Sequence, residues 1–149
     1  MIGFMKFINA TARCSTLYRD ERLAGSGLNG YQTPYVLTLC RNPGLTQEQL
    51  AARIHVNKSN VARQLALLEE NGFIERRPCE NDRRALKVYP TDKMHAVLPR
   101  LEGILGDWRR FVLCELTEEE QNTLGELLER VAHKAETFET LLAEQRGAQ

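Results

Sequence analysis

Residues 45–90 place two helix patterns, a tight turn and two strand patterns in direct succession, and this order restricts the folds open to the chain. Thr46 followed three residues later by Gln49 is the pair that caps a helix start reciprocally. After a turn at 55–57, Asn57 can cap a second helix. The second helix has a predicted buried stripe at i, i+4 and i+7, namely Val61, Leu65 and Leu68. We therefore expect two helices that pack on a common core.

The opposite face of the second helix carries hydrogen-bonding side chains whose only formal charges are positive. They are Lys58, Ser59, Asn60, Arg63 and Gln64. Arg and Lys donate to guanine acceptors, and Asn and Gln pair with adenine. In a helix-turn-helix the start of the second helix enters the major groove. The pattern predicts contacts to DNA, whereas the alternative is an ordinary solvated helix face.

After Gly72 the apolar spacing changes from helical to alternating, which predicts strands at 74–78 and 85–89. Leu86 and Val88 should lie on the same side of the second strand. The two strands then form a hairpin.

The loop of this hairpin, residues 79–84, is charged. The hairpin residues that we predict to contact DNA are Arg77, Asp82, Arg83, Arg84 and Lys87. An Arg on such a tip can enter the minor groove, where negative potential is focused. Because a carboxylate near phosphates is repelled, we expect Asp82 to pair with Arg84 or a nearby Arg and to hold that side chain in position.

Two of these motifs resemble the MarR family of bacterial transcription regulators, which are winged helix-turn-helix proteins. Asp82-Arg83-Arg84-Ala85 is similar to the wing signature of that family, and residues 68–74 are similar to the exit of its recognition helix. The resemblance is best over residues 29–91. It implies an obligate homodimer whose interface is formed by helices from both termini. It also implies DNA contacts from the recognition helix and the wing, with Asp82 bracing Arg84 in the minor groove.

Helices are predicted on both sides of this region. A first helix should end near residues 25–27, and a second should begin near Asn29. Thr91 can cap a long helix that contains Pro99, and a last helix opens with a capping box at 117–120. The apolar stripe of the last helix is too wide for the rest of this chain to cover, so we expect a partner subunit to cover it. The alternative is a monomer whose helices fold back on their own core.

The predicted fold class is therefore mainly α with a small β-hairpin wing. We expect a single domain over residues 1–149, in which a winged helix-turn-helix region at 28–91 lies between dimerisation helices at 1–27 and 92–149.

Charge is segregated along a chain whose net charge is zero. Residues 53–87 hold eight Lys or Arg against five Asp or Glu, whereas residues 115–144 hold nine Glu against two basic residues. The acidic segment should therefore face away from DNA. There is no apolar run for a membrane span and no signal-peptide pattern, and the four Cys show no paired spacing, so we expect a cytoplasmic protein without disulfides.

Other residues suggest regulation by a small molecule. A pocket for an aromatic or phenolic effector could be lined by Arg13, Tyr31, Tyr35 and Trp108, although core aromatics are the alternative. Some members of the family sense hydroperoxides through a Cys on the N-terminal helix that tyrosine hydroxyls hold. Cys14 and Tyr18 have the spacing of one helical turn, so a hydroperoxide-sensing repressor is a second possibility, with a buried structural Cys as the alternative.

Neither a cofactor nor a metal is expected, because the three His lack a ligand spacing with one another or with Cys. The chain has no Gly-rich phosphate loop and no nucleophile motif, so we expect no enzyme activity. The rival from another class is a winged-helix module that binds proteins through its wing.

Overall fold

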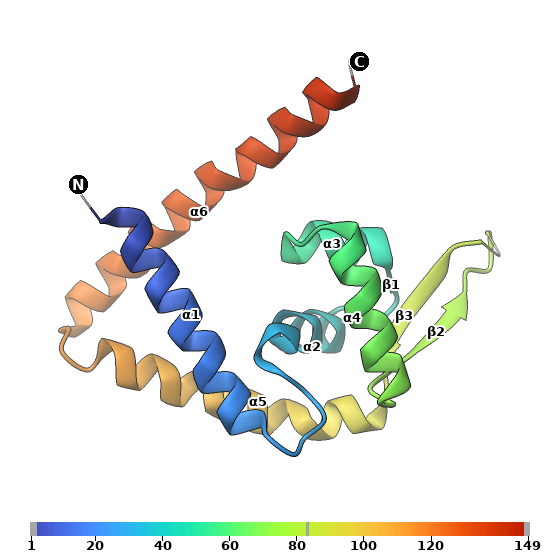
Figure 1. The fold of residues 1–149 in the computed structure, drawn as a ribbon, viewed down its shortest axis with the longest axis horizontal. Coiled ribbons are helices and arrows are strands. Elements are labelled where there is room, and N and C mark those ends of the chain that lie inside the picture. Colours follow the sequence, from blue (N-terminus) through green and yellow to red (C-terminus); the bar gives the residue numbers. More distant parts are fainter. Residues whose placement is uncertain (1–2, 83, 148–149) are drawn as a thin grey trace. The chain divides into compact units, whose positions relative to one another are not determined.

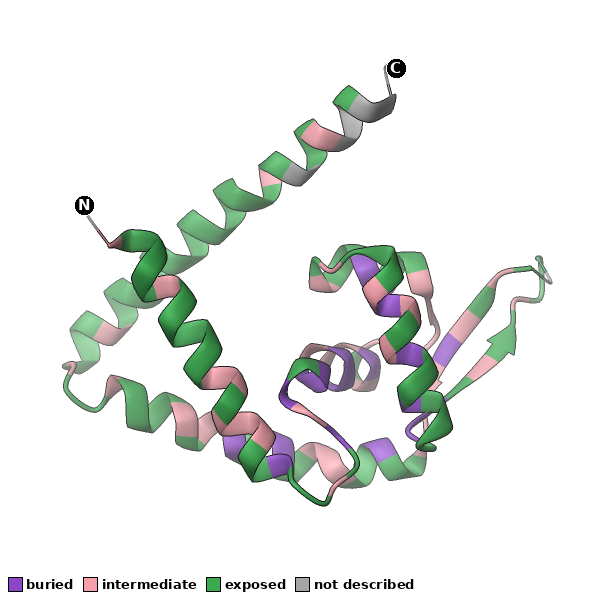
Figure 2. Cartoon of the chain, viewed as in Figure 1, coloured by how far each residue is buried: buried purple, intermediate pink, exposed green. Residues whose placement is uncertain are grey.

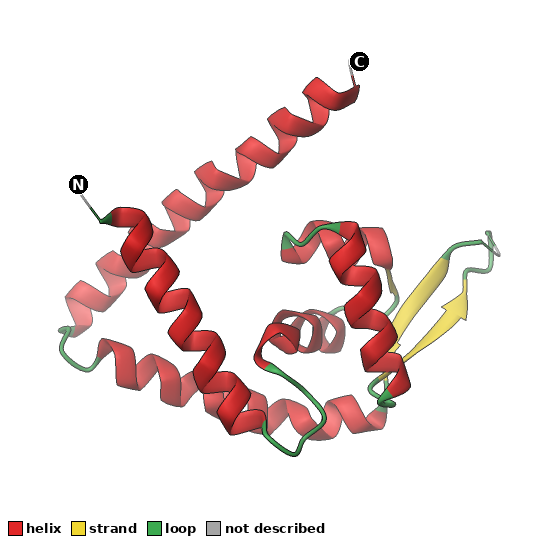
Figure 3. Cartoon of the chain, viewed as in Figure 1, coloured by secondary structure: helices red, strands yellow, loops and turns green. Residues whose placement is uncertain are grey.

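The computed structural model describes residues 3–82 and 84–147 and is mostly helical (Figure 1; Figure 3). The elements are α1 (Phe4–Leu23), η1 (Gly30–Gln32), α2 (Thr33–Arg41), β1 (Leu45–Thr46), α3 (Gln47–Ile54), α4 (Lys58–Glu70), β2 (Ile74–Pro78), β3 (Leu86–Pro90), α5 (Asp92–Leu113) and α6 (Glu118–Gly147). They form two compact units, Met1–Trp108 and Arg109–Gln149, with the boundary inside α5.

The core of the first unit lies between α2, α3, α4 and the sheet and also includes residues of α1 and α5, and Figure 2 shows buried residues on all of these elements. The predicted stripe of α4 is confirmed, because Val61, Leu65 and Leu68 are all fully buried. Phe73, directly before β2, and Val88 on β3 extend this core onto the sheet. Burial of this stripe leaves the other face of α4 in solvent.

The sheet has three antiparallel strands in the order β1-β3-β2, rather than the hairpin alone that we predicted. β2 and β3 pair with Ile74 opposite Pro90, which confirms the hairpin. The missed strand is β1, which pairs Leu45 with Val88. Two residues are too short to show an alternating pattern, so only the tertiary pairing with β3 defines this strand.

The helix starts around the turn are capped as predicted. Gln49 N donates to Thr46 Oγ1 at 3.2 Å and Thr46 N donates to Gln49 Oε1 at 2.9 Å. Asn60 N donates to Asn57 Oδ1 at 2.8 Å. Between the two helices His55 has φ of 53°, a left-handed conformation that ends α3 and turns the chain into α4.

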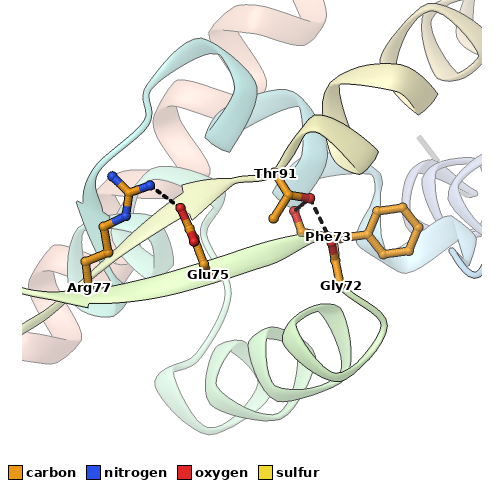
Figure 4. Close-up of polar contacts among 5 residues, drawn as sticks. All are labelled: Gly72, Phe73, Glu75, Arg77 and Thr91. Atoms are coloured by element: carbon orange, nitrogen blue, oxygen red, sulfur yellow. Dashed lines mark hydrogen bonds and ion pairs between the residues drawn. The ribbon is translucent and has the colours of Figure 1, made fainter.

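Thr91 directly precedes α5, as predicted, and its carbonyl accepts from His95 N at 3.1 Å, but the hydrogen bonds of its hydroxyl to described residues lie elsewhere. Its hydroxyl lies 2.7 Å from Gly72 O and 3.0 Å from Phe73 O, and Figure 4 shows it facing these two carbonyls. Gly72, with φ of 76°, ends α4 in the left-handed conformation that was expected. The hydroxyl shares its one proton between these two carbonyls, and Phe73 O also accepts from Thr91 N at 3.0 Å, so these bonds tie the exit of α4 to the start of α5.

η1 is hydrogen-bonded to α1. Gly30 N donates to Asp20 Oδ1 at 2.6 Å, and Arg19 Nε donates to Gly30 O at 3.2 Å. A Cβ on Gly30 would lie 2.6 Å from Thr16 O, so only glycine fits this approach. The contact joins α1 to the start of α2.

The second unit contains α6, which is one of the two longest helices and starts as predicted. Thr117 N donates to Glu120 Oε2 at 2.8 Å, and Glu120 N donates to Thr117 Oγ1 at 3.3 Å. Its apolar side chains are exposed in the single chain, as Figure 2 shows for the helix as a whole: Leu124, Leu127, Leu128, Val131, Phe138 and Leu141. No helix in the described ranges combines the length and apolarity that a bilayer crossing requires.

Candidate nucleic-acid interface

The polar face of α4 begins at the Asn57 cap and carries the five predicted DNA-binding residues of that helix. Lys58, Ser59 and Arg63 are exposed, whereas Asn60 and Gln64 are half-buried. Arg63 Nη2 donates to Asn60 Oδ1 at 2.7 Å, which aligns these two side chains one turn apart. The structure therefore presents donors and acceptors on rigid backbone at the start of α4.

Lys58 forms an ion pair with a residue of the neighbouring helix α3. Its Nζ lies 2.7 Å from Glu48 Oε1, and both side chains are largely exposed. The hydrogen bond and positive charge of Lys58 hold the pKa of Glu48 below its ordinary value. At neutral pH this ion pair is therefore formed, and Lys58 must exchange Glu48 for any phosphate that it contacts.

A cavity of about 300 Å³ lies beside α4. Its lining residues are Tyr31, Tyr35, Val56, Asn60, Arg63 and Gln64. Burial raises the pKa of the Tyr35 hydroxyl, and the positive charge of Arg63 opposes that shift only in part. Tyr35 is thus a neutral phenol at physiological pH, with Arg63 as the cationic side chain of the cavity.

The arginines on β2 of the wing contact nearby side chains. Arg77 forms an ion pair with Glu75, which Figure 4 shows on the same strand, and its guanidinium lies 4.5 Å from the ring centroid of Tyr89. Arg76 Nε lies 3.2 Å from Glu69 Oε2, but off the line that a hydrogen bond requires. In the backbone register of the hairpin, Lys87 on β3 lies opposite Arg77 on β2.

At the tip, Asp82 Oδ1 accepts a hydrogen bond from Arg84 N at 2.9 Å. We expected a side-chain pair, but the bond found among the described residues goes to the backbone and closes an Asx turn. The Arg84 side chain lines a second cavity, of about 320 Å³, with Thr46, Glu48, Arg76 and Leu86 among the other lining residues. The predicted contact Arg83 lies outside the described residues.

The cavity beside α4 is lined by two of the four residues of the predicted effector pocket. Tyr31 and Tyr35 share the cavity beside α4, but Arg13 and Trp108 do not line it. The ring centroid of Trp108 is 5.2 Å from that of Tyr18, because α5 packs this residue near α1. Arg13 is exposed on α1.

The predicted redox pair lies on α1. Cys14 is exposed, which excludes a buried structural role within the single chain. Tyr18 packs against Trp108, and the guanidinium of Arg22 lies 5.1 Å from its ring centroid.

Sequence reasoning missed two residues that shape the α4 face. Glu48 was not expected to hold Lys58, since no sequence spacing relates residues on separate helices. Gln32, buried in η1, donates through Nε2 to Gln64 Oε1 at 3.1 Å. The spacing of Asn29 and Gln32 would have predicted their capping box, but not the bond to α4.

Known proteins are similar to this chain in sequence and in fold. The sequence model of the MarR family matches residues 26–85. The uncharacterised HTH-type transcriptional regulator YybA of Bacillus subtilis (strain 168) is 35% identical over 136 residues, 91% of each chain. The crystal structure of the transcriptional regulator SlyA superposes with a TM-score of 0.85 at 27% sequence identity. The match covers 89% of this chain and 94% of the SlyA chain.

A MarR family regulator from Listeria monocytogenes, crystallised with a 26-mer DNA, has the same fold with a TM-score of 0.85 at 23% identity, over 92% of this chain and 91% of that one. The fold, the capped helix-turn-helix with its wing, and the 35% identity of YybA lead to one conclusion. This chain belongs to the MarR family of winged helix-turn-helix, DNA-binding transcriptional regulators.

Proposed function

We propose that this protein is a cytoplasmic repressor that binds a pseudo-palindromic operator as a homodimer. The observation that carries the proposal is the start of α4, where Asn57 caps the helix and Ser59, Asn60 and Arg63 stand on its uncovered face. The Listeria regulator crystallised with DNA supports the same use of the fold.

In this proposal α4 is the recognition helix and lies in the major groove. Asn60, Arg63, Gln64 and Ser59 contact base edges and supply specificity, while Lys58 and the basic residues of the wing contact phosphates and supply affinity. Arg84 enters the adjacent minor groove, and the Asx turn at Asp82 fixes the backbone from which it extends.

The dimer is supported by apolar side chains that the single chain leaves in solvent. On α1, Phe4, Phe7 and Leu17 are exposed, and on α6 Phe138 is 61% exposed. A surface of this kind on two separate helices is typical of an obligate interface. We propose that residues 1–27 and 92–149 form it, while 28–91 binds DNA.

The cavity beside α4 is a candidate site for a small aromatic or phenolic effector with a carboxylate. Tyr31 and Tyr35 supply aromatic surface, and Arg63 supplies a positive charge. An effector that pairs with Arg63 would remove it from the DNA, and would bind the DNA-free state more tightly than the DNA-bound state. Binding of salicylate-like and phenolic compounds should raise the melting temperature of the free protein and lower its operator affinity.

The first test is selection of bound sequences from a random duplex library with the full chain at about 150 mM salt. An enriched inverted repeat with half-sites about one helical turn apart establishes a dimeric, sequence-specific regulator. Enrichment of a single half-site contradicts the dimer. The absence of enrichment contradicts the proposal, and a salt-insensitive protein partner would then favour a winged-helix protein-interaction module.

Oligomeric state is tested separately by light scattering. Leu127→Asp should dissociate the dimer, because it places a charge in the apolar stripe of α6. Asn122→Asp is the matched control, because it adds the same charge at an exposed polar position of the same helix. Dissociation of both variants, or of neither, contradicts an interface on the apolar face.

A further inference from the structure

A buried amide in η1 reaches the recognition helix. Gln32 is only 2% exposed, and its Nε2 donates to Oε1 of Gln64, with 3.1 Å between the two atoms. This bond joins η1 to the polar face of α4. It determines which end of the Gln64 amide faces η1.

The orientation of both amides follows from a backbone group that can only donate. Asn29 N donates to Gln32 Oε1 at 3.1 Å, so the oxygen of Gln32 faces Asn29 and its Nε2 faces Gln64. Gln64 must then present its oxygen to Gln32. Rotating either amide by half a turn would place two donors or two acceptors against each other.

The Nε2 group of Gln64 is therefore the end that faces away from η1. Among the described residues it has no hydrogen-bond partner, and Gln64 is half-buried at the edge of the same cavity as Asn60 and Arg63. Its carbonyl oxygen is directed toward a buried side chain instead. An adenine paired bidentately needs this oxygen as an acceptor beside Nε2, and Gln32 already takes one of its two lone pairs and turns the oxygen toward η1, which disfavours that pairing.

We propose that Gln32 is a positioning residue that presents Gln64 to DNA as a hydrogen-bond donor, so that Gln64 reads an acceptor on a base edge. The inference rests on the proposed function. Guanine and thymine carry acceptors and no amino group on their major-groove edges. Adenine carries its N7 acceptor beside an amino donor that would oppose the Gln64 amino group, and cytosine carries only an amino donor. Gln64 selects guanine or thymine at the position that it contacts.

The position is found by repeating the duplex selection with Gln64→Ala and comparing it with the wild type. One position in each half-site should lose a preference for guanine or thymine of roughly 3- to 10-fold, the effect of one hydrogen bond. If guanine is preferred, 7-deazaguanine or an inverted base pair at that position should weaken binding of the wild type and leave Gln64→Ala unaffected.

The sharper test reverses the amide. In Gln32→Glu one carboxylate oxygen still accepts from Asn29 N, and the other accepts from Gln64 Nε2. The oxygen of Gln64 then faces outward, and the preference should shift to cytosine or adenine. Gln64→Glu should cause the same shift in base preference. Because Gln64 lies on a helix face that tolerates polar groups, this variant keeps the test valid if Gln32→Glu impairs folding.

Gln49→Glu is the matched control. Gln49 closes the capping box of α3, on Thr46, and the same substitution adds the same charge without touching Gln64. It should lower affinity uniformly, if at all, and leave every base preference unchanged. Melting temperatures of all variants separate folding defects from changes in recognition.

Three results with the wild type and Gln64→Ala would overturn the inference. They are an unchanged motif in Gln64→Ala, a uniform loss of affinity across all sequences, which indicates a phosphate contact, and a wild-type preference for adenine at that position. A failure of the proposed function is distinct, because the wild type would then enrich no motif. A shift in Gln49→Glu equal to that in Gln32→Glu would assign the effect to charge and reject the positioning role.

Discussion

Replacing Gly30 by Ala should destabilise the protein, because the new Cβ would meet backbone rather than a movable side chain. The Cβ would lie 2.6 Å from Thr16 O, whereas ordinary contact begins at 3.4 Å, so η1 or α1 must move by about 0.8 Å. The same shift would strain the 3.2 Å bond from Arg19 Nε to Gly30 O. It would also disturb the 2.6 Å bond from Gly30 N to Asp20.

Steric overpacking typically costs about 1–3 kcal/mol, and a hydrogen bond to a carboxylate contributes about 1.5–3 kcal/mol. Because movement relieves the clash at the expense of the bonds, the two costs overlap. We expect a loss of about 2–4 kcal/mol in the free energy of unfolding, which corresponds to a drop in Tm of roughly 5–12 °C.

The assay is thermal unfolding by circular dichroism at one protomer concentration, since Tm of an oligomer depends on concentration. Gly103→Ala is the control of opposite sign. A Cβ there meets no atom within 4 Å, and Ala inside a helix should stabilise by about 0.5–1 kcal/mol. A Gly30→Ala protein as stable as the wild type would refute the tight clasp between α1 and η1.

Three further predictions concern DNA binding. Arg84→Ala should weaken operator affinity by about 1–3 kcal/mol while light scattering still shows the dimer; unchanged affinity would remove the wing from the mechanism. Arg63→Ala should also relax base preference in the duplex selection, which loss of a phosphate contact would not do. Glu48→Gln frees Lys58, so DNA affinity measured by fluorescence anisotropy should rise roughly 2- to 5-fold. Because Lys58 lowers the pKa of Glu48, the wild-type ion pair is present at neutral pH and is lost only as pH falls through that lowered value; a Glu48→Gln protein with unchanged affinity at pH 7 would contradict its role.

Local features of the sequence predicted most of the fold. The capping boxes at Thr46 and Thr117, the Asn57 cap and the left-handed Gly72 are all confirmed. Each involves residues within about one helical turn, so the spacing of side-chain donors and acceptors suffices to predict it. The buried stripe of α4 was predictable for the same reason, because helical periodicity alone defines a face.

Contacts between distant segments were not predictable. Thr91 was interpreted as a helix cap, but its hydroxyl lies against Gly72 and Phe73, which are 19 and 18 residues away. The strand β1 exists only because Leu45 meets Val88. Propensity over a few residues contains no information about either pairing.

The candidate site divides in the same way. The sequence by itself determined which side chains α4 offers to DNA, since the residue types and the helical period decide them. Only the tertiary structure decided how these side chains are held: Lys58 by Glu48, and Gln64 by the buried Gln32. The physical reason is that a hydrogen bond has a direction, and the end of an amide that faces outward depends on the partner that packing brings to its other end.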